Sequence, residues 1–136
     1  MTDRDRALVA LRPAIGVVDA EASGADPEAA VSEMEAFLHR TLRPVLKLQN
    51  ETLLALVSAD VARRVPGFEG FAPDDRRQRL AETLRRDSRL KRVLLGVVLG
   101  ALTAGELAFA LAHEAEVRRR IVALLAERIG SQAERV

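Results

Sequence analysis

The chain has 136 residues, of which 49% are hydrophobic, yet it contains no cysteine, tryptophan or tyrosine and only four phenylalanines. The absence of cysteine excludes disulfides, thiolate metal sites and a cysteine nucleophile, and the shortage of aromatic residues requires an aliphatic core. The net charge is only +1, but residues 1–39 carry a balance of −5 and residues 73–100 a balance of +4, so these two segments can attract each other within one fold or between subunits.

The hydrophobic pattern predicts an all-α fold. No sustained alternation of apolar and polar residues marks a strand, and the β-branched residues stand among alanine, leucine and arginine. A chain of this length can bury about two thirds of its unfolded surface without disulfides or metals. We therefore expect a single helical domain over residues 1–136, built as a compact bundle of four or five helices.

The segment at residues 1–25 predicts a short or kinked helix that is loosely attached to the rest. Apolar residues recur at helical spacing from Leu8 onward, but Pro13 and Gly16 both interrupt the pattern. A proline also disfavours helical geometry at the residue before it, which here is Arg12.

A long helix is expected over about residues 27–64, with a kink at Pro44. The Asp-Pro-Glu sequence at 26–28 supplies an N-cap acceptor, a proline at the first helical position and an acid near the positive end of the helix dipole. The apolar face keeps its phase across the proline, which favours one kinked helix over two unrelated ones. The stripe then rotates, so the helix should bend or restart near residues 49–51 and end before Pro66.

Two further boundaries follow from turn and cap residues. Residues 66–73 form a turn-rich connection whose two phenylalanines should fold back onto the core. The next helix, to about residue 86, carries few core residues and should lie on the surface. Asp87 and Ser88 are cap residues that should separate it from the helix that follows.

The most apolar stretch, residues 93–112, is long enough to span a membrane. However, Thr103 and Glu106 have the Ser/Thr-x-x-Glu spacing of a capping box, which begins a new helix. A helix start at this point divides the stretch into pieces too short to cross a bilayer, and a continuous span would hold a carboxylate in lipid. We therefore predict a central helix over residues 88–102 that is hydrophobic on almost every side, and we expect no membrane association.

Gly96 and Gly100 form a GxxxG pair within this central helix. Such a pair allows another helix to approach closely in a soluble bundle, and it forms a dimerisation ridge in membranes. We favour packing within the fold, with both glycines buried.

The last helix is expected over about residues 104–129, followed by an untethered tail at 131–136. Glu114 and Arg118 fall in the middle of its apolar face, at the i, i+4 spacing that allows them to bond each other. Three interpretations remain open: a buried ion pair that fixes register, a pair that lines a crevice, or a contact with another subunit. His113 completes the group that we would mutate first if the protein were an enzyme.

A basic segment at residues 76–92 is the candidate for anion binding. It lacks the interleaved aromatic residues that stack on bases, and it fits no known nucleic-acid-binding signature. A solvated face, partly paired with neighbouring acids, is the favoured explanation. The candidate anion-binding residues are Arg76, Arg77, Arg79, Arg85, Arg86, Arg89 and Arg92.

The sequence contains no catalytic motif, metal-ligand cluster or phosphate loop, and we expect no cofactor. It favours a non-enzymatic helical interaction or scaffold protein that self-associates or binds another protein. The first alternative is binding of nucleic acid or an acidic partner through residues 76–92, and the second is a membrane-associated helical protein. The N-terminus does not resemble a secretory signal, which together with the lack of cysteine indicates a cytoplasmic protein.

Overall fold

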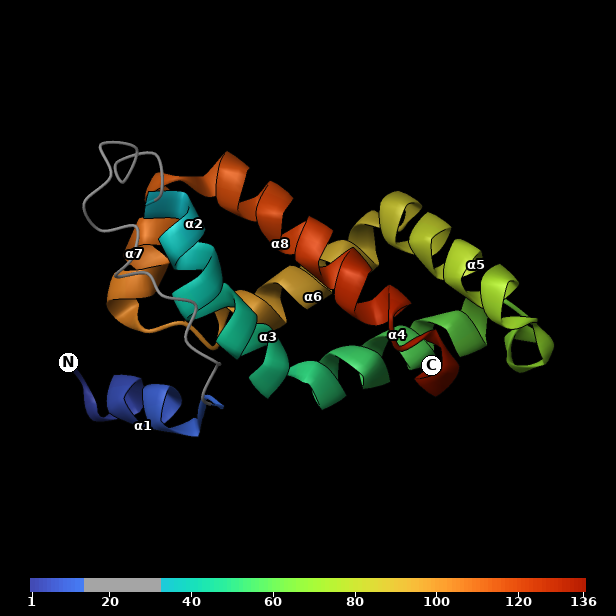
Figure 1. The fold of residues 1–136 in the computed structure, drawn as a ribbon, viewed down its shortest axis with the longest axis horizontal. Coiled ribbons are helices and arrows are strands. Elements are labelled where there is room, and N and C mark those ends of the chain that lie inside the picture. The colour runs from blue at the N-terminus through green and yellow to red at the C-terminus, as the bar shows by residue number, and fades with distance from the viewer. Residues whose placement is uncertain (14–32) are drawn as a thin grey trace.

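The computed structural model in Figure 1 describes residues 1–13 and 33–136. These residues form helices and short connections with no strand among them, which confirms the predicted all-α class. The α-helices are α1 (Asp3–Leu11), α2 (Glu33–Phe37), α3 (Arg43–Leu48), α4 (Asn50–Arg64), α5 (Pro73–Arg86), α6 (Ser88–Leu99), α7 (Ala104–Ala112) and α8 (Glu114–Gly130). A π-helical turn, η2 (Leu38–Leu42), and two 3₁₀ turns, η3 (Phe68–Gly70) and η4 (Ala133–Arg135), complete the described elements.

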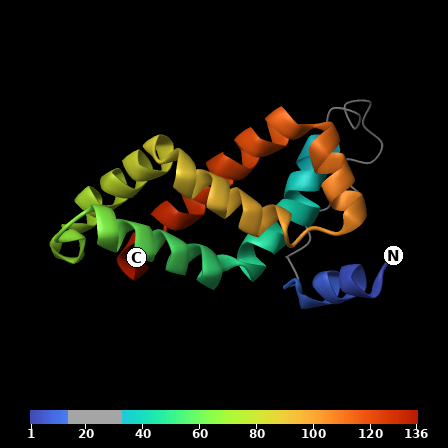
Figure 2. The same ribbon diagram turned by 180° about the vertical axis from the view of Figure 1, so that it is seen from behind.

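Helix α8 runs lengthwise from α7, at one end of the molecule, toward α5 and the C-terminal segment (Figures 1 and 2). It packs against α5, α6 and α7, while α4 packs against α6. The side chains in the core are mostly aliphatic, as the composition predicts. The largest fully buried ones are Leu42, Leu46, Leu53, Leu80, Leu94, Leu102, Ile121, Ile129, Val45, Val57, Val61 and Val98.

The predicted kink at Pro44 takes the form of a π-helical turn directly before the proline. The chain is continuously helical from α2 through η2 to α3, and the Arg43 amide donates to the Leu38 carbonyl, five residues back. This wider turn accommodates a residue that lacks an amide hydrogen of its own. The helix then restarts at Asn50, within the predicted region, and α4 ends at Arg64. The predicted start at 26–28 lies outside the described residues.

Helix α5 and its boundaries also follow the sequence. Only Leu80 and Leu84 of α5 are buried, so it is the surface helix that its composition predicts. The Asp87 side chain accepts a hydrogen bond from the Leu90 amide at 2.9 Å and caps α6. Phe68 is 3% exposed, which places it in the core as expected.

Helix α6 packs against α4, α5 and α8. The prediction that this central helix is buried on almost every side is wrong. Its buried residues are Leu90, Leu94 and Val98, whereas Val93 is 41% exposed. The neighbouring helices cover one face of α6, and the opposite face is left open. Helix α6 therefore has more apolar surface than the described helices bury.

The apolar stretch is divided at Thr103, as the capping box predicts. The Thr103 hydroxyl accepts from the Glu106 amide at 3.2 Å, and the Glu106 carboxylate accepts from the Thr103 amide at 2.8 Å. No helix among the described residues is both long enough and apolar enough to cross a membrane.

The C-terminal region differs from the prediction in two respects. The expected single helix over 104–129 is broken at His113, whose backbone φ of −121° and ψ of 39° end α7 and precede α8. The tail is not untethered, because Ala133 is 3% exposed and Arg135 pairs with Glu51 at 2.5 Å. The Arg76 guanidinium also donates to the Ala133 carbonyl at 3.4 Å, which fastens the tail to α5.

Replacing Thr103 with alanine is expected to destabilise the protein by about 1–2 kcal/mol, because α7 loses its N-cap at a buried position. Urea unfolding followed by circular dichroism measures this change. Ser88→Ala, at the exposed first position of α6, is the control and should change the unfolding free energy by less than about 0.5 kcal/mol. Equal effects of the two substitutions would contradict a role for the capping box.

Candidate functional site

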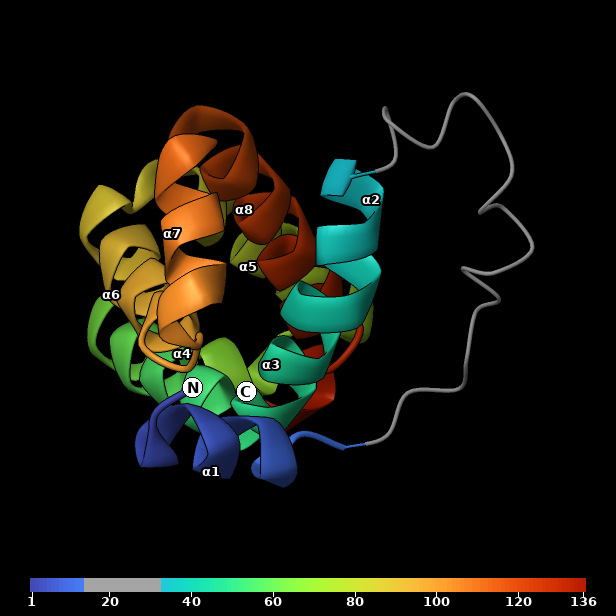
Figure 3. The ribbon, with the colours of Figure 1, turned by 90° about the vertical axis from the view of Figure 1, so that its left-hand side faces the viewer.

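A groove of about 500 Å³ lies between α6 on one side and α7 and α8 on the other. Figure 3 views the molecule from the end where α6, α7 and α8 come together. The lining is mainly apolar, with Leu95, Leu99, Leu111 and Ile121 among the contributing side chains. Leu111, the second-last residue of α7, is 59% exposed and is one of the large hydrophobic side chains that the described chain leaves accessible to solvent. The groove is therefore an apolar surface that the described part of the chain does not cover.

Charged residues stand around this apolar lining. Lys91 and Arg92 come from α6, and Glu114 and Arg118 come from the first turns of α8. Glu114 and Arg118 form an ion pair at 2.8 Å, so their charges largely compensate each other. The excess charge around the groove is consequently positive.

The structure does not support the first of the three interpretations of Glu114 and Arg118, which is a buried ion pair. Their side chains are 62% and 61% exposed. They do lie on the same side of α8 as Ile121, but they occupy its first two turns, where the groove separates α8 from α6. Helical periodicity predicts which face a residue occupies and not whether another element covers that face. The pair lines a groove, as the second interpretation expects, and a contact with another subunit stays a prediction.

The prediction that Gly96 and Gly100 are buried in a helix contact is also wrong for the described chain. Gly96 lines the groove, and a Cβ atom placed there would have no heavy atom within 4 Å. Gly100 is exposed and follows the last residue of α6, where a Cβ would lie 3.0 Å from the Gly96 carbonyl oxygen. No described helix of this chain crosses the two glycines.

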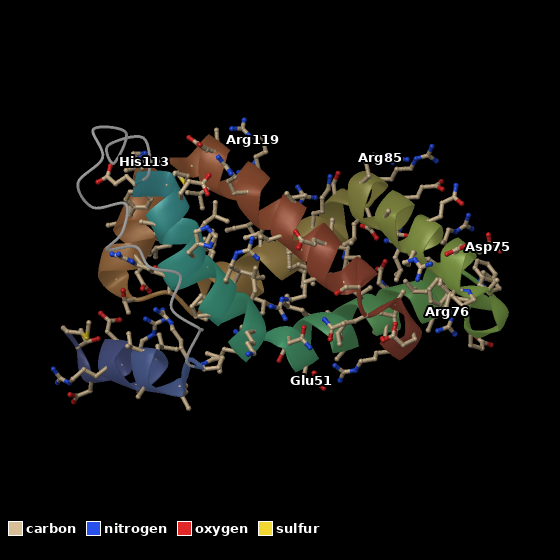
Figure 4. The ribbon with its side chains drawn as sticks, in the orientation of Figure 1. Glu51, Asp75, Arg76, Arg85, His113 and Arg119 are labelled. Atoms are coloured by element: carbon tan, nitrogen blue, oxygen red, sulfur yellow. The ribbon has the colours of Figure 1, made fainter. Side chains whose placement is uncertain are left out.

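His113 does not line the groove. Its ring stacks against Phe109 with a centroid separation of 4.4 Å, and Phe109 in turn contacts Phe37 at 4.6 Å. The side chain is exposed at the junction between α7 and α8, as Figure 4 shows. The structure thus brings together two of the three residues that the sequence grouped and leaves the histidine apart.

The arginines of residues 76–92 do not form one anion-binding surface. Arg76 lies 5.2 Å from the Phe68 ring centroid and donates to the Glu69 carbonyl at 2.8 Å. Arg77 pairs with Asp74, and Arg86 pairs with Glu82 at 3.2 Å. Figure 4 shows Arg85 on the outer side of α5 and Arg76 toward the C-terminal segment. The remaining candidates also lie apart from one another. Arg79 lines two small pockets beside α5. Arg89 is exposed on α6, and Arg92 lines the groove.

Sequence reasoning missed an ionic attachment of α1 to the connection between α6 and α7. Arg12 forms two hydrogen bonds to the Glu106 carboxylate, at 2.5 and 2.7 Å, and a third to the Ala101 carbonyl at 3.2 Å. Asp5, which is 5% exposed, accepts from the Ala104 amide at 3.2 Å. Arg4 donates to the Gly100 carbonyl at 2.7 Å. The first helix is therefore held by specific polar contacts and is not loosely attached.

Glu106 is the centre of this attachment. Partial burial on its own would raise the pKa of Glu106, but hydrogen bonds from Arg12 and from the Thr103 amide outweigh that effect and lower the pKa below its ordinary value. The Thr41 hydroxyl lies 3.4 Å from the same carboxylate. The sequence identified Glu106 as a capping residue, but nothing local connects it to an arginine 94 positions away.

A second buried ionic cluster joins α4 to the start of α6. Asp60, with 4% of its side chain exposed, pairs with Arg63 at 2.9 Å and with Arg64 at 3.3 Å, and Arg64 also reaches Asp87 at 3.5 Å. The pKa of Asp87 is lowered chiefly by its hydrogen bond from the Leu90 amide, and further by the charge of Arg64. Each of these carboxylates has an arginine partner, although Asp60 Oδ2 and Asp87 Oδ2 are buried without a hydrogen bond. The ion pairs indicate a structural role.

Neither polar cluster has the geometry of a catalytic site, and among residues 1–13 and 33–136 no three His, Asp or Glu side chains are grouped as metal ligands. Comparison of the chain with protein-family models, curated proteins and solved structures finds no match.

Replacing Glu106 with glutamine is expected to cost about 2 kcal/mol at pH 7, because glutamine keeps a cap acceptor but loses the charge that pairs with Arg12. The folded pKa of Glu106 is lowered from its ordinary 4.5, so the ionised form stabilises the fold above about pH 4.5, and this contribution disappears as the pH falls through the folded pKa. Denaturant unfolding from pH 7 to pH 3 should therefore show the two proteins converging. Glu114→Gln is the matched surface control, and a difference that does not depend on pH would contradict the assignment.

Replacing Gly96 with alanine is expected to raise the unfolding free energy by about 0.5–1 kcal/mol. Alanine is the better helix former, and the space around the glycine holds no atom that the new methyl group would meet. Thermal and urea unfolding both measure this gain. A loss of stability would show that the glycine is in close contact with another element after all.

Proposed function

We propose that this chain is a helical protein-interaction module that binds an amphipathic, acid-flanked helix of another protein in the groove between α6 and α8. The single observation that supports the proposal is a large, mainly apolar groove with a positively charged edge, which lies on the packed core and includes the core residues Ala110, Val117 and Ile121 in its lining. Binding of a helix in a groove is a common mode of recognition and requires no catalytic group.

The apolar lining fits the stripe of a helix with leucine-like residues at every third or fourth position. Such a stripe would cover Leu99 and Leu111, which are otherwise accessible to solvent. Gly96 contributes no side chain at the centre of α6, so the backbone of a bound helix can come closer there than anywhere else along α6. The GxxxG pattern then serves a contact with a partner.

The charge around the groove favours an acidic partner over a second copy of this chain. Lys91 and Arg92 have no compensating acid among the residues that line the groove, because Glu114 is paired with Arg118. A symmetric dimer through this surface would place the same basic residues against each other. Acidic residues on either side of an apolar stripe would pair with them and increase the association rate.

Binding of nucleic acid is less well supported. The arginines of α5 are divided between ion pairs, contacts with backbone carbonyls and separate faces of the helix. A phosphate backbone requires a continuous row of cations, and stacking on bases requires aromatic groups. Neither is present on α5.

The test uses two designed helical peptides of about 18 residues with the same leucine stripe, one flanked by glutamates and the other by lysines. Fluorescence anisotropy should show that the glutamate peptide binds at least about tenfold more tightly, a difference of ~1.4 kcal/mol. Gly96→Leu should fill the groove and weaken binding about tenfold or more without unfolding the protein. Ala123→Leu, which adds the same bulk to an exposed position of α8 outside the groove, is the control.

Equal binding of both peptides, or equal loss in both variants, would contradict the proposal. Light scattering on the wild type and on Gly96→Leu examines self-association in the same samples. If the wild type is a dimer and Gly96→Leu dissociates it, the occupant of the groove is a second copy of this chain and not an acidic helix.

A further inference from the structure

A second cavity, of about 250 Å³, lies between α3 and the C-terminal end of α8 and shares no lining residue with the groove. Two arginines enter it, Arg43 from α3 and Arg128 from α8. Leu46 and Leu124 supply apolar wall, and both are buried. Glu127 lines the cavity as well, so the cavity combines two positive charges and one negative charge with partial exclusion of water.

Neither arginine forms an ion pair within 4 Å among the described residues, and Glu127 balances their two charges only in part. Arg43 has no ion pair within 4 Å there, and its Nε atom is buried without a hydrogen-bond acceptor. Arg128 makes one long hydrogen bond, 3.3 Å, to the Asn50 side chain. Arg12 Nε and Asp60 Oδ2 are also buried without a hydrogen-bond partner, but Arg12 forms an ion pair with Glu106 and Asp60 forms one with Arg63. Arg43 differs from both, because it has no oppositely charged partner within 4 Å among the described residues.

The two arginines also repel each other. The pKa of Arg128 is lowered first by burial and then by the charge of Arg43, and the nearby Glu127 carboxylate opposes this only in part. Burying two like charges without partners costs free energy. A negatively charged ligand would remove this cost, since it would satisfy the free donors and screen the repulsion at the same time.

We propose that the cavity between Arg43 and Arg128 is a binding site for a small phosphate-bearing ligand. Guanidinium groups present paired N–H donors that match the oxygens of a phosphate, and two of them can neutralise a dianion. The volume corresponds to about eight water molecules, at roughly 30 Å³ each, which admits a phosphate with a few further atoms. Leu46 and Leu124 would contact the apolar part of such a ligand.

The arginine side chains would attract the phosphate, and the dipole of α8 would not. Arg128 lies in the last turn of α8, where the helix dipole is negative and disfavours anions. The Ser131 hydroxyl and the Gln132 amide both donate to the Arg128 carbonyl, so neither is free in this structure. Substituting either arginine should therefore abolish binding.

Thermal unfolding with and without about 10 mM inorganic phosphate, at constant ionic strength maintained with chloride, tests the proposal. Phosphate should raise the Tm of the wild type by about 4 °C if it exceeds its Kd about tenfold. It should not raise the Tm of Arg43→Gln or Arg128→Gln. Arg119→Gln is the matched control, because Arg119 is exposed on the same helix and forms no ion pair with the described residues; it should respond as the wild type does. Titration calorimetry should give one site per chain.

The phosphate-free samples distinguish a binding site from a structural pair. Because Arg43 and Arg128 repel each other, Arg43→Gln should have a Tm equal to or above that of the wild type in chloride alone. A lower Tm for this variant in chloride, an equal phosphate shift in all four proteins, or no shift in the wild type would each overturn the proposal.

Discussion

The carboxylate of Glu106 is the interaction on which the arrangement of this protein most depends. It caps α7 by accepting from the Thr103 amide, and it accepts two hydrogen bonds from Arg12. The first contact ends an apolar run that would otherwise continue as one helix, and the second holds α1 against the turn that results. One side chain thus determines both where the chain changes direction and which remote segment covers that turn.

The boundaries that could be predicted from the sequence are those with local signals. Thr103 with Glu106, Asp87, and the Pro66-Gly67 pair each end or begin a helix through groups within a few residues, and the structure places a boundary at each. The break at His113 has no such signal, since no side chain caps α8 there. It depends on how α7 and α8 pack and could not be predicted from periodicity.

Contacts between residues far apart in the sequence could not be predicted either. Arg12 and Glu106 lie 94 positions apart, and Arg43 and Arg128 stand on helices whose proximity no local pattern reveals. The sequence did identify Gly96, Arg92, Glu114 and Arg118 as noteworthy, each for a different reason. The structure places all four around one groove. Hydrophobic periodicity predicts the faces of helices correctly, but whether a face is covered depends on the lengths and crossing of its neighbours.

The turn between α6 and α7 belongs to two surfaces at once. Leu99 and Ala110, on either side of it, line the groove, whereas the carbonyls of Gly100, Ala101 and Leu102 accept hydrogen bonds from α1. A molecule that shifts this turn when it binds in the groove also alters the hydrogen bonds that hold α1. Thermodynamic linkage then requires the reverse, so that release of α1 changes the affinity of the groove by the same factor. Amide hydrogen exchange in α1 would accordingly report occupancy of a surface that α1 itself does not line.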